Sequence, residues 1–135
     1  MRIVFDTNVL VAAVVASGVC RDLVEYCTEH HDLVTSRFIL DELREKLDRK
    51  FRLTPDVVEG ILSSFEGRMQ VVDPLPLDPP ACRDPDDDWV LATAVEGGCD
   101  CVITGDADLL DLQQIQGVRL LKPRAFLDLE SPPEW

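Results

Sequence analysis

Apolar residues along the chain form short continuous runs that alternate with longer segments in which apolar positions recur every three or four residues. The short runs predict buried strands, at residues 2–5, 33–35, 69–72, 101–103 and 118–121. The longer segments predict helices, at residues 19–30, 36–50, 54–67, 86–97 and 123–127, with a short helical turn at 108–112. Strands that alternate with helices favour an α/β fold in which a parallel sheet carries helices on both faces.

One domain accounts for the chain, because 135 residues lie within the usual size of a single domain. The hydrophobic content of 46% is sufficient for a buried core and argues against disorder. Five of the nine prolines fall in residues 73–85, which we interpret as a loop, because too little chain follows them for a second core. We therefore expect a single domain over residues 1–130 and a loose C-terminal tail at 131–135.

The chain carries 13 basic and 26 acidic residues, which gives a formal net charge of −13. This balance argues against a protein that coats nucleic acid through bulk charge, but not against an enzyme that acts on nucleic acid. Five cysteines without a disulfide-like spacing are typical of a reducing compartment. No apolar run approaches the roughly 20 residues of a membrane span. We therefore expect a cytoplasmic protein that does not enter a membrane.

Two of the predicted strands are followed closely by an aspartate, Asp6 in one case and Asp106 in the other. We expect these two side chains to meet, because the carboxyl ends of parallel strands lie at one edge of the sheet, where open α/β folds bind ligands. Taken alone, Asp6 is equally well explained as a helix cap or a hydrogen-bonded turn. Taken alone, Glu42 is better explained as a solvated acid at the border of a buried helix face. Several carboxylates at one edge raise one another's pKa values, and a divalent cation neutralises such a cluster. Oxygen ligands without His or Cys at ligand spacing favour Mg²⁺ or Mn²⁺ over Zn²⁺.

Four acidic motifs occur in a fixed order: Phe5-Asp-Thr-Asn-Val-Leu10, Leu40-Asp-Glu-Leu43, Asp84-Pro-Asp-Asp-Asp-Trp-Val-Leu-Ala92 and Val102-Ile-Thr-Gly-Asp-Ala-Asp-Leu-Leu110. Through these motifs, over about residues 2–127, the chain resembles the PIN-domain family, and most of all its branch of toxin components of toxin–antitoxin systems, the VapC-like ribonucleases. The resemblance implies a three-layer α/β/α sandwich with a mainly parallel central sheet. It also implies a Mg²⁺- or Mn²⁺-dependent endoribonuclease that uses water to leave 5′-phosphate and 3′-hydroxyl ends.

The resemblance also assigns site residues, position by position. It implies four catalytic acids, which are Asp6, Glu42, Asp88 and Asp106. Of these, Asp6, Asp88 and Asp106 would hold the metal ion, and Glu42 would hold a water or act as general base. Three consecutive aspartates leave the register of the third acid open, so Asp87 is the alternative to Asp88. An accessory acid and three polar residues that orient the carboxylates are also implied, namely Asp108, Thr7, Asn8 and Thr104.

Basic residues for holding RNA are concentrated in the helix that carries Glu42. Lys46 and Arg49 follow Glu42 by four and seven positions, which places them on the same helix face, where they could hold phosphates that flank the cut. The alternative is a helix surface on which these residues pair with Glu45 and Asp48. Single-stranded RNA is the favoured substrate, because the fold offers a cleft and no element that reads a duplex.

The expected partners are the RNA substrate, a small antitoxin protein and a second copy of the chain in a homodimer. The antitoxin and the homodimer are implied by the family resemblance. The net charge of −13 favours a basic partner. Apolar side chains of the 54–67 helix that are expected to be exposed are candidates for these contacts.

Other classes that combine acids with an α/β fold agree less well with the sequence. Phosphatases of the haloacid dehalogenase type need a second aspartate where this chain has Asn8, and phosphate-receiver domains carry their reactive aspartate in the middle of the chain. The G-x-x-x-x-G-K motif of nucleotide hydrolases is absent from the sequence. A catalytically inactive PIN-like module that binds RNA or protein is the remaining alternative, and the presence of all four acids argues against it.

Overall fold

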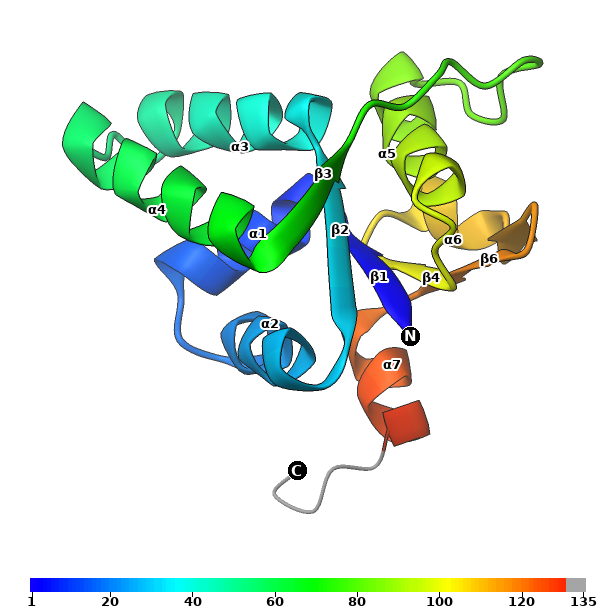
Figure 1. Ribbon diagram of the computed structural model, residues 1–135, viewed down its shortest axis with the longest axis horizontal. Coiled ribbons are helices and arrows are strands. Elements are labelled where there is room, and N and C mark those ends of the chain that lie inside the picture. Colours follow the sequence, from blue (N-terminus) through cyan, green and yellow to red (C-terminus); the bar gives the residue numbers. More distant parts are fainter. Residues whose placement is uncertain (131–135) are drawn as a thin grey trace.

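The computed structural model describes residues 1–130, so the expected tail at 131–135 lies outside the described residues. Six strands form one sheet in the order β3-β2-β1-β4-β6-β5 (Figure 1). All neighbouring strands are parallel except β5 and β6. The strands are β1 (Arg2–Phe5), β2 (Asp32–Ser36), β3 (Met69–Val72), β4 (Cys101–Ile103), β5 (Gln114–Ile115) and β6 (Val118–Leu121).

Helices cover both faces of this sheet, which makes the α/β/α sandwich that the sequence predicts. Helices α5 and α6 lie on one side of the sheet in Figure 1, α1 to α4 lie on the opposite side, and α7 packs against α2. The helices are α1 (Thr7–Val15), α2 (Val19–His30), α3 (Arg37–Arg49), α4 (Pro55–Arg68), α5 (Pro85–Glu96), α6 (Ala107–Asp111) and α7 (Pro123–Glu130). None of these helices is by itself long and apolar enough to cross a membrane, and α1 and α2 meet that test only as a pair bent by 107°.

Most of the predicted elements are confirmed, and two elements of the structure were not predicted. Helix α1 is apolar over almost its whole length, so it lacks the alternation of polar and apolar positions that identifies a surface helix. Strand β5 has only two residues and pairs with β6 through a tight turn. Gln116 and Gly117 in that turn have φ angles of 47° and 82°, and positive values at both positions are typical of a type I′ hairpin turn.

The parallel pairing of β1 with β4 determines where the two strands end. Phe5 is in register with Ile103, and the backbone N–H of Asp6 donates to the carbonyl of Ile103 over 2.9 Å. Both strands are buried, and each is followed by polar residues rather than by further apolar ones. The residues that follow β1 and β4 therefore emerge together at the carboxyl edge of the sheet.

The end of α5 approaches β2 closely, and this contact gives a test of the fold. A methyl group added at Gly97 would lie 2.7 Å from Cγ1 of Val34. Gly97→Ala should therefore lower the free energy of unfolding by about 1–3 kcal/mol, the usual effect of overpacking. Urea denaturation measures this loss.

Gly60→Ala is the matched control, because Gly60 lies in the exposed part of α4 with no atom within 4 Å of the added methyl group. Alanine favours a helix, so this variant should gain about 0.5–1 kcal/mol. If Gly97→Ala were as stable as the wild type, the close packing of α5 on β2 would be incorrect.

Candidate active site

Asp6 is a buried carboxylate at the carboxyl end of β1. Its Oδ2 accepts a hydrogen bond of 2.8 Å from the hydroxyl of Thr104, which directly follows β4. Burial raises the pKa of Asp6 above its ordinary value of 3.8, while the Thr104 hydroxyl and the backbone N–H of Thr7 act in the opposite direction. The nearby charge of Asp106 raises this pKa further. Asp6 is thus a buried acid with another acid beside it.

Thr104 joins the ends of the two strands. Its hydroxyl donates to Asp6, and the same oxygen accepts the backbone N–H of Asp106 over 3.0 Å. Oδ1 of Asp106 in turn accepts the backbone N–H of Asp108 over 2.8 Å, which makes Asp106 the N-cap of α6. One threonine therefore fixes a buried acid on β1 relative to two acids at the start of α6.

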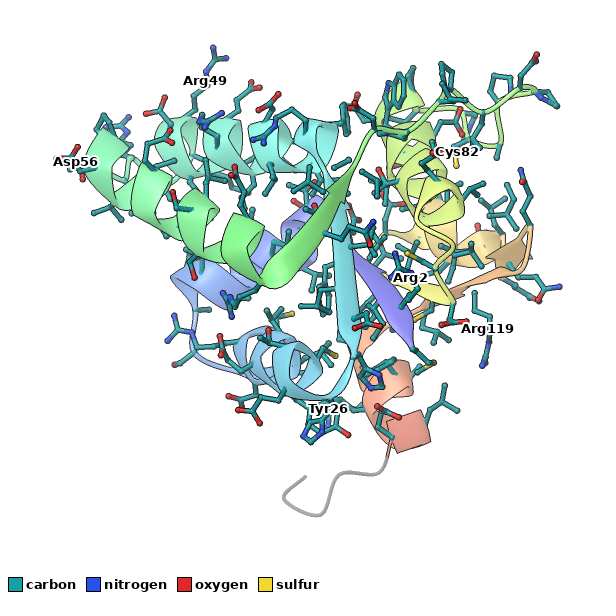
Figure 2. All side chains as sticks on the ribbon, in the orientation of Figure 1. Arg2, Tyr26, Arg49, Asp56, Cys82 and Arg119 are labelled. Carbon is teal, nitrogen blue, oxygen red and sulfur yellow. The ribbon has the colours of Figure 1, made fainter. Side chains whose placement is uncertain are left out.

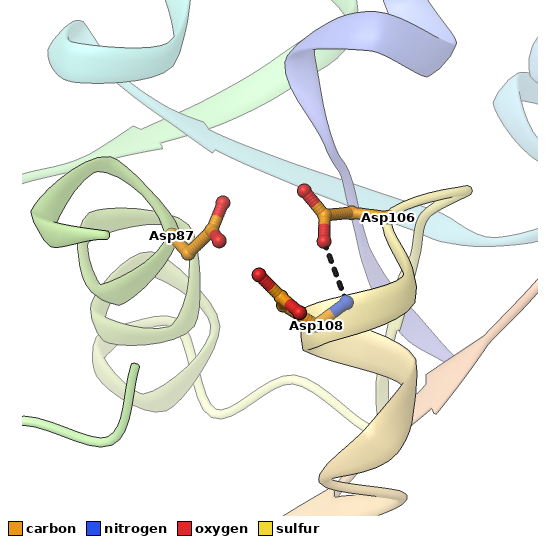
Figure 3. Close-up of side chains that lie close together, drawn as sticks. All are labelled: Asp87, Asp106 and Asp108. Carbon is orange, nitrogen blue, oxygen red and sulfur yellow. Dashed lines mark hydrogen bonds between the residues drawn. The ribbon is translucent and has the colours of Figure 1, made fainter. Parts of the chain in front are cut away.

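Three carboxylates meet at this edge of the sheet, those of Asp87, Asp106 and Asp108 (Figure 3). One oxygen from each lies within 4.8 Å of the others. Partial burial raises the pKa of Asp87 to about 6, and the charges of Asp106, Asp84, Asp6 and Asp108 add to this effect. We call Asp6, Asp87, Asp106 and Asp108 the acid cluster.

The structure brings Asp87, the alternative that the sequence left open, to this group of carboxylates, and it places the side chain of Asp88 elsewhere. Oδ1 of Asp88 accepts the backbone N–H groups of Ala81 and Cys82 over 3.0 and 2.8 Å, so this side chain holds the proline-rich loop. Successive residues of a helix point about 100° apart, so neighbours in one turn face different surroundings. The helix spacing contained no signal that separates the three aspartates, because Asp86, Asp87 and Asp88 each lie four residues before a buried residue.

The remaining predicted acid, Glu42, lies beside the acid cluster rather than within it. Glu42 is half-buried on α3 and lines a hollow of about 290 Å³ together with Lys46 and Asp86. Among residues 1–130, the close group of three carboxylates does not include Glu42. Its predicted roles in catalysis therefore stay predictions.

The predicted orienting residues Thr7 and Asn8 both lie at the start of α1, next to Asp6. Thr7 is fully buried, and its hydroxyl has no hydrogen-bond partner among the residues that the structure describes. Oδ1 of Asn8 accepts a hydrogen bond of 2.7 Å from Nζ of Lys46. Asn8 is therefore in contact with a cation and not with a carboxylate.

The two predicted RNA-binding residues differ in their surroundings. Arg49 is largely exposed, pointing away from α3 into solvent in Figure 2, and it forms an ion pair of 3.3 Å with Glu45. This is the pairing that the alternative interpretation expected. Lys46 instead extends to Asn8 beside the acid cluster.

The donor set of the acid cluster fits a hard divalent cation. Its members offer carboxylate oxygens only, which are the ligands that Mg²⁺ and Mn²⁺ prefer. Cys82 lies close by on the loop (Figure 2), but burial and the charges of Asp88 and Asp87 raise the pKa of its thiol to about 12. A thiol that stays protonated at neutral pH is a poor metal ligand, because it is the thiolate that binds metals.

The fold and the acid cluster define a PIN domain, and comparison of sequences agrees. The profile of a PIN-domain family matches residues 2–108, so the chain belongs to this family. No curated protein matches the chain in sequence.

Three solved structures share the fold at low sequence identity. They are the structures of VapBC2 from Rickettsia felis bound to a DNA fragment from its promoter, of FitAcB from Neisseria gonorrhoeae, and of VapBC-1 from nontypeable Haemophilus influenzae. For the VapBC2 structure the TM-score is 0.66 and the identity 14%, over 90% of this chain and 98% of the other. For FitAcB the TM-score is 0.59 and the sequence identity 19%, over 90% of this chain and 98% of the other. For VapBC-1 the TM-score is 0.64 and the sequence identity 15%, over 92% of this chain and 99% of the other.

Asp87→Asn should flatten the dependence of stability on pH in the absence of metal. Because the pKa of Asp87 is raised from 3.8 to about 6, the folded state binds more protons than the unfolded state in this range. The wild-type chain should therefore lose stability as the pH rises from about 4 to about 6. Asparagine does not titrate, so the variant should melt a few degrees above the wild type at neutral pH. Melting curves in EDTA over this pH range measure the difference.

Asp111→Asn is the control, because Asp111 lies at the exposed end of α6 outside the acid cluster. It should follow the wild-type melting curve at each pH. Identical curves for Asp87→Asn and the wild type would contradict the crowding of Asp87 by the neighbouring acids.

Proposed function

We propose that this chain is a Mg²⁺- or Mn²⁺-dependent endoribonuclease that cleaves single-stranded RNA. The convergence of Asp6, Asp87, Asp106 and Asp108 at one sheet edge of a PIN domain carries this proposal. Crowded carboxylates destabilise a folded chain unless a cation balances them. A site with such crowded carboxylates is well suited to bind a divalent metal ion, which in turn binds a phosphodiester.

Each residue of the site has a role in this proposal. Asp6, Asp87 and Asp106 would hold the cation, and a cation bound there would supply a water of lowered pKa and polarise the phosphate that is cut. Thr104 keeps Asp6 and Asp106 at a fixed separation through its two hydrogen bonds. Glu42, on the neighbouring helix, orients the attacking water or accepts its proton. The products are RNA ends that carry a 5′-phosphate and a 3′-hydroxyl.

The RNA strand, in this proposal, follows the hollow along α3. Lys46, Arg49 and Lys50 line it together with Glu42, Glu45 and Asp86, so it holds both signs of charge next to the acid cluster. Lysine and arginine side chains bind phosphates without reading sequence. Positive charge at this one place allows a chain of net charge −13 to bind RNA locally.

We further propose that the chain is the toxin component of a toxin–antitoxin system in the cytoplasm. The similar structures are those of VapBC and FitAcB, which supports a small protein partner. An apolar groove of about 530 Å³ lies between α1, α2 and α4, and Val14, Ile61 and Phe65 are among the residues that line it. Val57 at its rim is 49% exposed. A basic antitoxin segment with an apolar face would complement this apolar groove and the chain's net charge of −13.

Substitution of the cluster acids tests the nuclease proposal. Asp6→Asn, Asp87→Asn, Asp106→Asn and Glu42→Gln should each reduce Mn²⁺-dependent cleavage of single-stranded RNA by orders of magnitude. Asp88→Asn should keep most of the activity, because asparagine still offers an oxygen to the N–H groups of Ala81 and Cys82. A fluorescent oligonucleotide assay with each purified variant gives these rates.

Asp111→Asn serves as the control and should cleave like the wild type. Wild-type activity in Asp6→Asn would reject the assignment of the site. A wild-type chain that binds RNA in Mn²⁺ without cleaving it would favour the alternative of an inactive binding module.

Light scattering tests the association of the chain with itself, which we propose as a homodimer on the basis of the family. The wild type should have the mass of a dimer at micromolar concentrations. A monomer at all these concentrations would remove the dimer from the proposal.

Val57→Asp places a charge at the apolar groove between α1, α2 and α4, so it should weaken antitoxin binding and leave the dimer intact.

A further inference from the structure

Lys46 places a positive charge at the edge of the acid cluster. It lies in the third turn of α3, and its Nζ reaches across to α1, where it donates to Oδ1 of Asn8 over 2.7 Å. Asn8 follows Asp6 by two residues, and Lys46 is near enough to Asp6 for the two charges to interact. Lys46 therefore lies beside the buried acid.

The Lys46 side chain contacts Asn8 on α1, although Glu42 on its own helix is also within reach of an ion pair. Glu45 and Arg49 are four residues apart on α3 and form an ion pair. Glu42 and Lys46 have the same spacing and the same order, which favours an ion pair on a helix. Within residues 1–130, however, the structure records the contact with Asn8 for Lys46 and no ion pair. The direct contact of its ammonium is thus with a neutral amide and not with a carboxylate.

The Lys46 ammonium has further N–H donors and lines a hollow that a phosphate can enter. An ammonium group has three N–H donors, and Asn8 accepts from one of them. Lys46 also lines the hollow of about 290 Å³ that begins next to Asp86, one residue before Asp87. A phosphodiester bound at the acid cluster would therefore pass the Lys46 ammonium.

We propose that Lys46 is a catalytic residue whose ammonium donates to a non-bridging oxygen of the phosphate that is cut, and not only to flanking phosphates. In the reaction, a water oxygen forms a bond to phosphorus, the bond from phosphorus to the 3′ oxygen breaks, and that oxygen leaves with a proton that originates from water. Lys46 keeps its protons throughout and stabilises the additional negative charge of the transition state. Asn8 positions the ammonium. This inference rests on the proposed nuclease function.

Lys46→Met tests the proposal through the separation of kcat from KM. Loss of one donor to the reacting phosphate should lower kcat by about 10²-fold, as loss of an oxyanion donor does, with little change in KM. Lys50→Met removes a cation of the same hollow that lies one helical turn further on. It should mainly raise KM and reduce the slope of binding against salt concentration by about one. Arg119→Met, an equal change of charge on β6 outside this hollow, should leave both constants unchanged.

Folding and metal binding are checked separately from activity. Lys46→Met should be folded, and Mn²⁺ should raise its melting temperature at least as much as that of the wild type, since a positive charge has been removed near the metal site. Lys46→Gln keeps a polar side chain of similar reach and provides a second variant if the first does not fold. A kcat within about twofold of the wild type in either folded variant, or a change confined to KM, would overturn the proposal. A wild-type chain that does not cleave RNA would reject the nuclease function itself, which is a different result.

Discussion

The hydrogen bond between the hydroxyl of Thr104 and the carboxylate of Asp6 holds the candidate site together. Asp6 lies at the end of a buried strand, where a carboxylate without a partner would be strongly unfavourable. Thr104 provides that partner from the neighbouring parallel strand, and its oxygen also accepts the backbone N–H of Asp106. Because β1 and β4 are paired in register, the threonine and the two acids keep one relative position. The other acids of the cluster are placed relative to this unit.

Sequence reasoning succeeded where a single periodic pattern determines the structure. The apolar runs of β1 and β4 identified two buried parallel strands, and the topology of parallel sheets then brought Asp6 and Asp106 to one edge. Where the local pattern is uniform, the sequence either did not reveal an element or left alternatives open. Helix α1 was not predicted, because it is apolar over almost its whole length. The three consecutive aspartates at the start of α5 carry no periodicity among themselves, which left Asp87 and Asp88 as alternatives. The choice between Asp87 and Asp88 depends on the position of the proline-rich loop, which is a tertiary contact.

The electrostatics of the chain show two opposing requirements. Negative charge dominates the whole chain, and it is concentrated further at the acid cluster, where the pKa of Asp87 rises to about 6. Positive charge is arranged more selectively. Arg37, Arg44 and Arg49 are paired with carboxylates on the helix surface, whereas Lys46 contacts a neutral amide. A cation that contacts a neutral amide beside several acids can attract a phosphate to that point, although the net charge of the chain is −13.

Asp87 and Asp88 are neighbours in the first turn of α5, and their side chains point in different directions and make different contacts. One faces the acid cluster, and the other accepts two backbone N–H groups from the loop before the helix. Rotation of this first turn about the helix axis would displace both side chains at once, so the contact with the loop resists any rotation that would move Asp87. The loop therefore holds the side chain of Asp87 in its orientation through the hydrogen bonds that it makes to Asp88. A change in the length of this loop that displaced Ala81 and Cys82 would therefore also loosen the position of Asp87.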